Sequence, residues 1–235
     1  MQIVLVPGLW LNASTWDAVV PELEAAGHTA HPLTLPGMAS KDADRSAVGL
    51  ADHVGAVVEA LDAAYDAGGG EQVLLVSHSA GCGIAHAATD ARPDKVGRQV
   101  HIGGFPGDDG DPLLSGLPAE NGEVAMPDWK EMGEDANVRD FSDEQLTQFY
   151  ADAIPVPERV ISEPVRLHDE RRWDVPATEI CPEYTAADLK EWVDGGHLAE
   201  LASIKEKDYV DLGGGHWPQL TQPKALAQAI LDAAR

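Results

Sequence analysis

Short apolar runs alternate with helical stretches along the first 105 residues, and this alternation constrains the fold more than any other feature. The runs QIVLVP (2–7), HTAHPLTL (28–35), QVLLVS (72–77) and RQVHIGGF (98–105) are predicted to be strands. The intervening helices are expected at 16–27, at 46–67 and at 82–93. Strands joined by helices pair in parallel and are covered by helices on both faces. The sequence therefore predicts an α/β fold with a mostly parallel, doubly wound sheet.

The alternation is interrupted once, after the fourth predicted strand. The chain there is rich in Gly, Pro and Asp, and a helix is then predicted within FSDEQLTQFYADAI (141–154). The strand and helix pattern resumes at VPATEIC (175–181) and continues to the final helix. We expect one sheet domain built from residues 1–110 and 173–235, with residues 111–172 inserted as a cap.

Acidic residues outnumber basic ones by 40 to 16, so the formal charge of the 235-residue chain is −24. This charge repels phosphate backbones and anionic lipids, so neither nucleic acid nor membrane is expected as a partner. No apolar run approaches the roughly 20 residues that span a bilayer, and no secretion signal is apparent. Cys82 and Cys181 lie far apart and do not suggest a disulfide framework. We expect a cytoplasmic protein and leave its oligomeric state open, a homodimer included.

The third predicted strand ends abruptly in the string SHSAGCG (77–83). In a sharp turn from a strand into a helix, the strand and the helix lie very close together. The residues two positions before and two positions after the nucleophile must then be very small. Ser79 meets this rule with Ser77 and Gly81, whereas Ser77 would have Leu75 at the earlier position. The string is a G-x-S-x-G nucleophile elbow with serine in place of the first glycine. Ser79 is therefore the candidate nucleophile; the alternative is an ordinary serine helix cap.

A serine nucleophile needs a general base within hydrogen-bond reach. Among nine histidines, His216 is placed best, because three glycines separate it from the last predicted strand and the final helix follows. Such a loop lies at the same sheet edge as the serine turn. Taken alone, His216 would be read as a surface-loop histidine. A serine after the middle strand and a histidine after the last strand, however, follow the chain order of α/β-hydrolases.

Three segments resemble small α/β-hydrolases of the hydroxynitrile lyase and plant methylesterase branch. They are VPGLWLNASTWDAVVPELEAAGHTAHPLTLPG (6–37), VSHSAG (76–81) and YVDLGGGHWPQLTQPKALAQAI (209–230). The resemblance covers essentially the whole chain outside the predicted cap, and it departs from the family after the first strand, where Pro-Gly replaces the usual His-Gly. It implies that the backbone N–H groups of Leu9 and Ala80 form an oxyanion hole. A helix dipole behind the Ala80 N–H would favour an anion there.

The carboxylate that would orient His216 is the least defined member of the site. The family pattern ends a strand with Gly-x-x-Asp, but this chain has tyrosine or threonine at the aspartate position. Glu183 is the carboxylate at the strand end and is ranked first. Asp108 and Asp109, which follow the preceding strand, are alternatives, as is Asp188, although Asp188 also fits a helix capping box.

Together these residues predict a serine hydrolase that cleaves small, largely apolar carboxylic esters through an acyl-enzyme. Trp10, His78 and Trp217 are expected to line the pocket. The glycines after Ser79 do not complete a dinucleotide loop, and no metal-binding spacing stands out, so no metal or other cofactor is expected. Two alternatives remain: a hydroxynitrile-lyase-like C–C lyase and a non-catalytic small-molecule-binding protein of the same fold. The lyase would usually need an added cation or donor, and no lysine adjoins the strand-end motifs.

Overall fold

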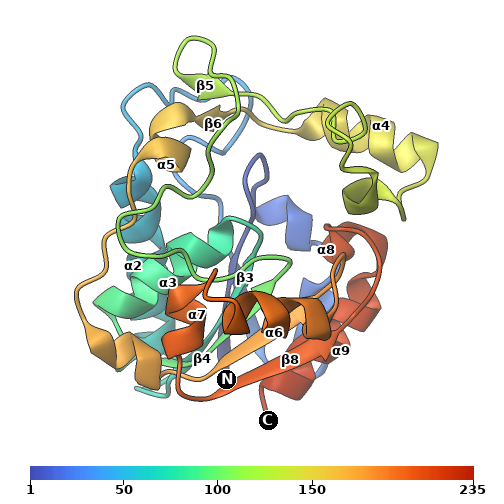
Figure 1. Cartoon of the computed structure of the whole chain (residues 1–235). Coiled ribbons are helices and arrows are strands. Elements are labelled where there is room, and N and C mark those ends of the chain that lie inside the picture. Colours follow the sequence, from blue (N-terminus) through green and yellow to red (C-terminus); the bar gives the residue numbers. More distant parts are fainter.

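The computed structural model describes all 235 residues and contains one six-stranded sheet (Figure 1). The strand order is β2-β1-β3-β4-β7-β8, and every neighbouring pair is parallel. The strands are β1 (Gln2–Val6), β2 (Thr29–Pro32), β3 (Val73–His78), β4 (Val96–Ile102), β7 (Ala177–Cys181) and β8 (Lys207–Asp211). Helices lie on both faces of this sheet. The predicted α/β fold is therefore confirmed.

The remaining regular elements are helices and one small antiparallel pair of strands. The α-helices are α1 (Val20–Ala25), α2 (Leu50–Ala67), α3 (Gly81–Ala91), α4 (Asp143–Asp152), α5 (Glu158–Ser162), α6 (Ala186–Asp194), α7 (Ala199–Ser203), α8 (Pro218–Thr221) and α9 (Pro223–Ala233). The 3-10 helices are η1 (Ala13–Trp16), η2 (Asp135–Val138) and η3 (Glu170–Asp174), and the small pair is β5 (Glu123–Val124) with β6 (Val156–Pro157). None of these helices combines the length and the hydropathy that crossing a bilayer requires.

The strands build two apolar cores, one on each face of the sheet. On one face, Ile3, Leu74 and Ile180 pack with helix residues that include Leu23 of α1 and Leu226 of α9. On the other face, residues of β1 and β3 pack against α2 and α3, and residues of β7 pack against α6 and α7. Successive side chains of a strand point to opposite faces, so a fully apolar strand must be covered twice. Burial on both faces of the sheet therefore explains why the strand sequences are continuous apolar runs.

Two helices differ from their predicted limits. Of the predicted helix 16–27, only residues 20–25 form an α-helix, α1, because Pro21 lacks a backbone N–H and fits only the first turn of a helix; η1 precedes it over residues 13–16. Helix α2 begins at Leu50 rather than at Ser46, because the Ser46 N–H donates to the Asp44 carboxylate in a turn of its own. Neither difference changes the order of the elements.

The segment between β4 and β7 contains β5, β6, α4 and α5. In Figure 1 these elements lie together on one side of the molecule, away from both chain termini. Helix α4 has a capping box: the Ser142 hydroxyl accepts the Gln145 N–H, and the Gln145 side chain accepts the Ser142 N–H. The limits 111–172 for an inserted cap stay a prediction.

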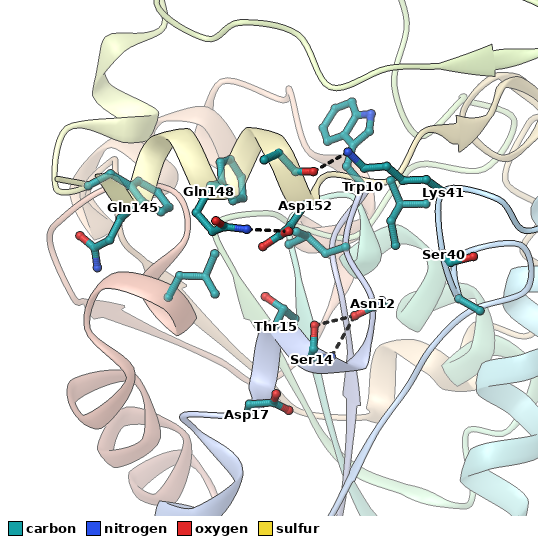
Figure 2. Close-up of a pocket in the computed structure, with 17 residues that line it drawn as sticks. Trp10, Asn12, Ser14, Thr15, Asp17, Ser40, Lys41, Gln145, Gln148 and Asp152 are labelled. Carbon is teal, nitrogen blue, oxygen red and sulfur yellow. Dashed lines mark hydrogen bonds between the residues drawn. The ribbon is translucent and has the colours of Figure 1, made fainter. Parts of the chain in front are cut away.

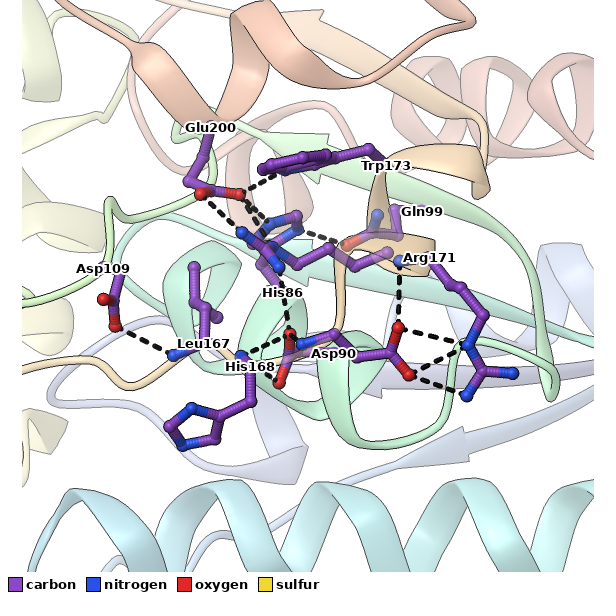
Figure 3. A network of polar contacts seen from close by, with 11 residues as sticks. His86, Asp90, Gln99, Asp109, Leu167, His168, Arg171, Trp173 and Glu200 are labelled. Atoms are coloured by element: carbon purple, nitrogen blue, oxygen red, sulfur yellow. Dashed lines mark hydrogen bonds and ion pairs between the residues drawn. The ribbon is translucent and has the colours of Figure 1, made fainter.

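Buried polar side chains fasten the end of this segment to the sheet domain (Figure 3). Arg172 of η3 lies 2.8 Å from Glu200 of α7 and 3.2 Å from Asp90 of α3. His86 Nε2 lies 3.1 Å from Glu200 Oε2, and all four side chains are buried. Burial acts to raise the pKa of Glu200, but hydrogen bonds from His86 and Arg172 outweigh it and hold that pKa well below its usual range. Glu200 is therefore ionised inside the protein.

We expect Arg172→Met to lower the free energy of unfolding by about 3–5 kcal/mol, because Asp90 and Glu200 would stay buried without their cation. Urea denaturation at neutral pH measures this loss. Arg171→Met is the matched control: this side chain is 58% exposed and pairs with two surface carboxylates, so its loss should not exceed about 1 kcal/mol. Equal losses in the two variants would contradict the role given to burial.

Candidate active site

Ser79 lies in the turn between β3 and α3, with a left-handed backbone conformation (φ 54°). Its N–H donates to the Ile102 carbonyl at 2.9 Å, and its own carbonyl accepts the Cys82 N–H at 2.9 Å. Residues with a side chain rarely adopt this conformation, so hydrogen bonds on both sides of the residue must hold it. The strand, tight turn and helix around Ser79 have the geometry that the sequence predicts.

Two glycines let neighbouring backbone approach this turn more closely than a side chain would allow. A Cβ atom on Gly81 would lie 2.4 Å from the Pro7 carbonyl oxygen, and one on Gly104 would lie 2.4 Å from the Ser79 carbonyl oxygen. Ser77 occupies the position where the elbow motif usually has glycine. Its buried hydroxyl donates to a carbonyl of β4 at 3.2 Å, so this serine is satisfied without entering the turn.

His216 reaches Ser79 from the loop between β8 and α8. Its Nε2 lies 2.8 Å from Ser79 Oγ, and its Nδ1 lies 2.5 Å from Glu183 Oε1. With a proton on Nδ1, the serine hydroxyl donates to Nε2 and the ring donates to the carboxylate. A hydroxyl, an imidazole and a carboxylate in this order can pass a proton from serine to histidine while the carboxylate stabilises the charged ring.

Two residues of the segment between β4 and β7 hold the histidine loop, and sequence reasoning missed both. The His216 N–H donates to the Asn137 carbonyl at 2.8 Å, and the Gly215 N–H donates to Asp140 Oδ2 at 2.9 Å. The Thr221 hydroxyl donates to the same carboxylate oxygen at 2.7 Å. Asp140 lies 75 positions before Gly215, so no local pattern in the sequence could indicate this contact.

Glu183 is the carboxylate that the structure places against His216, and the three other candidates have partners elsewhere. Each of them accepts a backbone N–H from another residue. These pairs are Asp108 with Glu200 at 2.8 Å, Asp109 with Leu167 at 2.9 Å and Asp188 with Thr185 at 2.9 Å. Gly103, with φ 58°, leaves room for the hydrogen bond between His216 and Glu183. A Cβ atom at this position would lie 3.2 Å from His216 Nδ1 and 3.3 Å from Glu183 Oε2.

Ser79, His216 and Glu183 line a cavity of about 700 Å³. Leu9 and Ala80 line it as well. Ala80 directly precedes α3, where the helix dipole favours negative charge. The role of the Leu9 and Ala80 N–H groups as an oxyanion hole stays a prediction.

Of the three residues expected to line the pocket, Trp10 lines this cavity, whereas the expectation for His78 and Trp217 is wrong. Both of the latter are buried behind His216, with ring centroids 4.9 and 4.8 Å from its ring. His78 is the last residue of β3, and its Nε2 donates to the His216 carbonyl oxygen at 2.7 Å. Burial holds the pKa of His78 well below its ordinary value, so the ring is neutral. Trp217 packs on Phe149 of α4 instead of on the cavity.

A larger cavity of about 830 Å³ opens between η1, residues 39–41 and α4 (Figure 2). Trp10 borders both cavities, but Ser79, His216 and Glu183 do not reach the larger one. Its polar side chains pair locally, as in the 2.8 Å hydrogen bond from Gln148 to Asp152. The larger cavity therefore lacks the hydroxyl, imidazole and carboxylate that line the cavity at Ser79.

Similarity to a known protein family extends over nearly the whole chain. A family model described as the alpha/beta hydrolase family matches residues 3–229. A protein of rice (Oryza sativa subsp. indica) named probable esterase PIR7A is 37% identical over 103 residues. This match covers 42% of the present chain and 37% of the rice protein, well under half of either.

Solved structures of similar fold cover nearly the whole chain. An extracellular alpha/beta-hydrolase of a Paenibacillus species, described as sharing structural and functional homology with tobacco salicylic acid binding protein 2, has a TM-score of 0.79 and 22% identity, and covers 99% of this chain and 98% of its own. The methylesterase MES16 of Arabidopsis has a TM-score of 0.75 and 18% identity, with coverage of 100% and 98%. A variant of tomato methylketone synthase I has a TM-score of 0.76 and 17% identity, with coverage of 99% and 97%. At such identities the likeness establishes the fold alone.

We expect Gly81→Ala to lower the free energy of unfolding by about 3 kcal/mol, because the new methyl group would meet the rigid Pro7 carbonyl. Thermal unfolding measures the change. Gly55→Ala is the matched control, since Gly55 also lies in a helix but has nothing within 4 Å of a new Cβ. That variant should be as stable as the wild type or more stable by up to about 1 kcal/mol. A Gly81→Ala protein as stable as Gly55→Ala would disprove the close approach.

The neutral His78 ring should make the fold sensitive to acid. The pKa of His78 is lower in the folded protein than in the unfolded chain, where it is near 6.5. The unfolded chain therefore takes up a proton first as the pH falls below about 6.5, and the folded protein loses stability until the pH reaches the folded pKa. Above about pH 6.5 this loss is absent. His78→Gln should therefore lose less stability than the wild type between pH 7 and pH 5, as measured by urea unfolding at several pH values. His197→Gln, which changes an exposed imidazole, should keep the wild-type slope. Equal slopes in wild type and His78→Gln would refute the assignment.

Proposed function

This chain belongs to the alpha/beta hydrolase family, and from that premise we propose that it is a serine esterase acting on small, largely apolar carboxylic esters. The observation that carries the proposal is the hydrogen-bonded chain Ser79–His216–Glu183 at the wall of a cavity. The rice relative is named a probable esterase and one fold neighbour a methylesterase, which supports ester chemistry. A cavity of about 700 Å³ suits a small molecule.

In the first half-reaction, Ser79 Oγ attacks the ester carbonyl carbon while its proton passes to His216 Nε2. The Glu183 carboxylate accepts the hydrogen bond from Nδ1–H and stabilises the imidazolium. The backbone N–H groups of Leu9 and Ala80 bind the negative oxygen of the tetrahedral intermediate. The intermediate collapses when His216 gives its proton to the leaving alcohol oxygen, and the acyl group stays on Ser79.

In the second half-reaction, water replaces the alcohol. His216 Nε2 takes a proton from the water as its oxygen attacks the acyl carbon. The second tetrahedral intermediate then releases the carboxylic acid, and Ser79 Oγ recovers its proton from His216. The protein returns to its starting state, and one ester and one water molecule have become one carboxylic acid and one alcohol.

The lining of the cavity also bears on the two alternative functions. A hydroxynitrile-lyase-like enzyme would usually need an added cation or donor beside the serine and histidine, and no Lys or Arg lines this cavity. A protein that only binds its ligand has no need of a serine, an imidazole and a carboxylate in hydrogen-bond sequence. Both observations favour hydrolysis.

A fluorophosphonate probe should label the wild type and leave Ser79→Ala unlabelled, because only the activated Ser79 hydroxyl forms the covalent adduct. p-Nitrophenyl acetate should give a burst of p-nitrophenol equal to the amount of enzyme, followed by slower turnover. Labelling without turnover of any ester would favour the lyase. An unlabelled wild type would favour the binding protein.

We expect Glu183→Gln to lower kcat by about 10²- to 10⁴-fold, because the amide no longer selects the productive tautomer of His216 or stabilises its charge. Initial rates with p-nitrophenyl esters measure the loss. Asp188→Asn is the control, since Asp188 caps α6 and should leave kcat within about two-fold of the wild type. Similar rates for Glu183→Gln and wild type would exclude Glu183 as the orienting acid.

A further inference from the structure

The cavity that holds Ser79 has a one-sided distribution of charge. Its lining includes carboxylates and no Lys or Arg; these carboxylates are Asp108, Asp111, Glu134 and Glu183. Asp108 accepts a backbone N–H and Glu183 bonds to His216, so these two are engaged. Asp111 and Glu134 are exposed and make no side-chain hydrogen bond or ion pair within the chain. Two free negative charges therefore stand where the cavity opens to solvent.

Aromatic side chains line the same cavity as these charges. The aromatic lining residues are Trp10, Phe105, Trp129, Tyr184 and Trp192. Three large hydrophobic side chains of the chain are exposed, and two of them, Trp192 at 36% and Met132 at 51%, line this cavity. The Trp192 ring packs against Tyr184, with 5.1 Å between ring centroids. Apolar surface that is left in water at the mouth of a site is typical of a surface that a ligand covers.

Aromatic faces and free carboxylates together favour one class of ligand. The face of a tryptophan or tyrosine ring attracts ammonium groups, most strongly quaternary ones that hold no water tightly, and a nearby carboxylate adds to the attraction. An anionic group would be repelled by the same carboxylates. We propose that the enzyme prefers esters that carry a permanent cation, such as a trimethylammonium group, over neutral esters of the same shape. This inference rests on the proposed esterase function and specifies its substrate class.

The net charge of the chain and the nearby Arg139 must both be considered in testing this preference. The whole chain carries a formal charge of −24, which attracts any cation over a long range without a specific site. Arg139 lies near the cavity, but its guanidinium donates to the Pro182 carbonyl at 3.5 Å and is not part of the lining. The test must therefore separate Asp111 and Glu134 from the charge of the rest of the surface.

The experiment compares kcat/KM for two matched pairs of esters at about pH 8, where histidine side chains are ordinarily neutral. Butyrylcholine is paired with 3,3-dimethylbutyl butyrate, which places the cation on the alcohol. Methyl 4-(trimethylammonio)butanoate is paired with methyl 5,5-dimethylhexanoate, which places it on the acyl group. Each ratio is divided by the ratio of alkaline hydrolysis rates, so that intrinsic reactivity cancels. We expect the cationic member of at least one pair to be preferred by about 3- to 10-fold, and the preference to shrink as salt is added.

Asp111→Asn/Glu134→Gln should reduce this preference to about two-fold or less. Glu59→Gln/Asp66→Asn removes the same charge from exposed positions of α2 and should keep the wild-type preference. Normal hydrolysis of the neutral esters with no preference in either pair would overturn the inference and leave the esterase proposal intact. Equal loss of preference in both double variants would also overturn it, because the attraction would then come from net charge. Hydrolysis of neither member of either pair, with no fluorophosphonate labelling, would overturn both proposals.

Discussion

The architecture of the site depends on the close approach of three backbone segments at one edge of the sheet. Strands β1, β3 and β4 are neighbours and run in the same direction, so the loops that follow them meet at their carboxyl ends. The turn at Ser79 lies between Pro7 on one side and Gly104 on the other, at distances that exclude a side chain on Gly81 or Gly104. The left-handed conformation of Ser79 is stable because the segments that follow β1 and β4 pack against the turn from both sides. The nucleophile of the proposed esterase is thus positioned by neighbouring strands in the middle of the sheet.

The proposed general base is positioned in a different way. His216 belongs to a glycine-rich loop whose backbone is held by Asn137 and Asp140 of the segment between β4 and β7. His78 supports the same loop from behind, through the carbonyl oxygen of His216. The segment that walls the cavity therefore also orients the base. A change in that segment that moves Asp140 would also move His216 of the proposed esterase, without touching a bound substrate.

The few basic residues of this acidic chain are unevenly distributed. Arg172 is buried, and it neutralises Asp90 and Glu200. No Lys or Arg lines the cavity, and its lining carboxylates Asp111 and Glu134 are exposed to solvent. A buried carboxylate needs a cation to be stable, whereas an exposed one does not. The same excess of acid is thus compensated inside the protein and left free at the surface, where a ligand can meet it.

The sequence by itself determined the fold class, the order of strands and helices, and the choice of Ser79 over Ser77. Each of these follows from residues close together in the chain: apolar runs of strand length, and the small residues that a tight turn requires. The three-dimensional structure alone decided which of four carboxylates contacts His216, and that Asn137 and Asp140 hold its loop. It also placed His78 and Trp217 behind His216 instead of in the cavity. The pleat of β3 directs the His78 side chain, and Trp217 packs on Phe149 of α4. Contacts between segments tens of residues apart leave no local pattern in a single sequence, and only the folded chain brings them together.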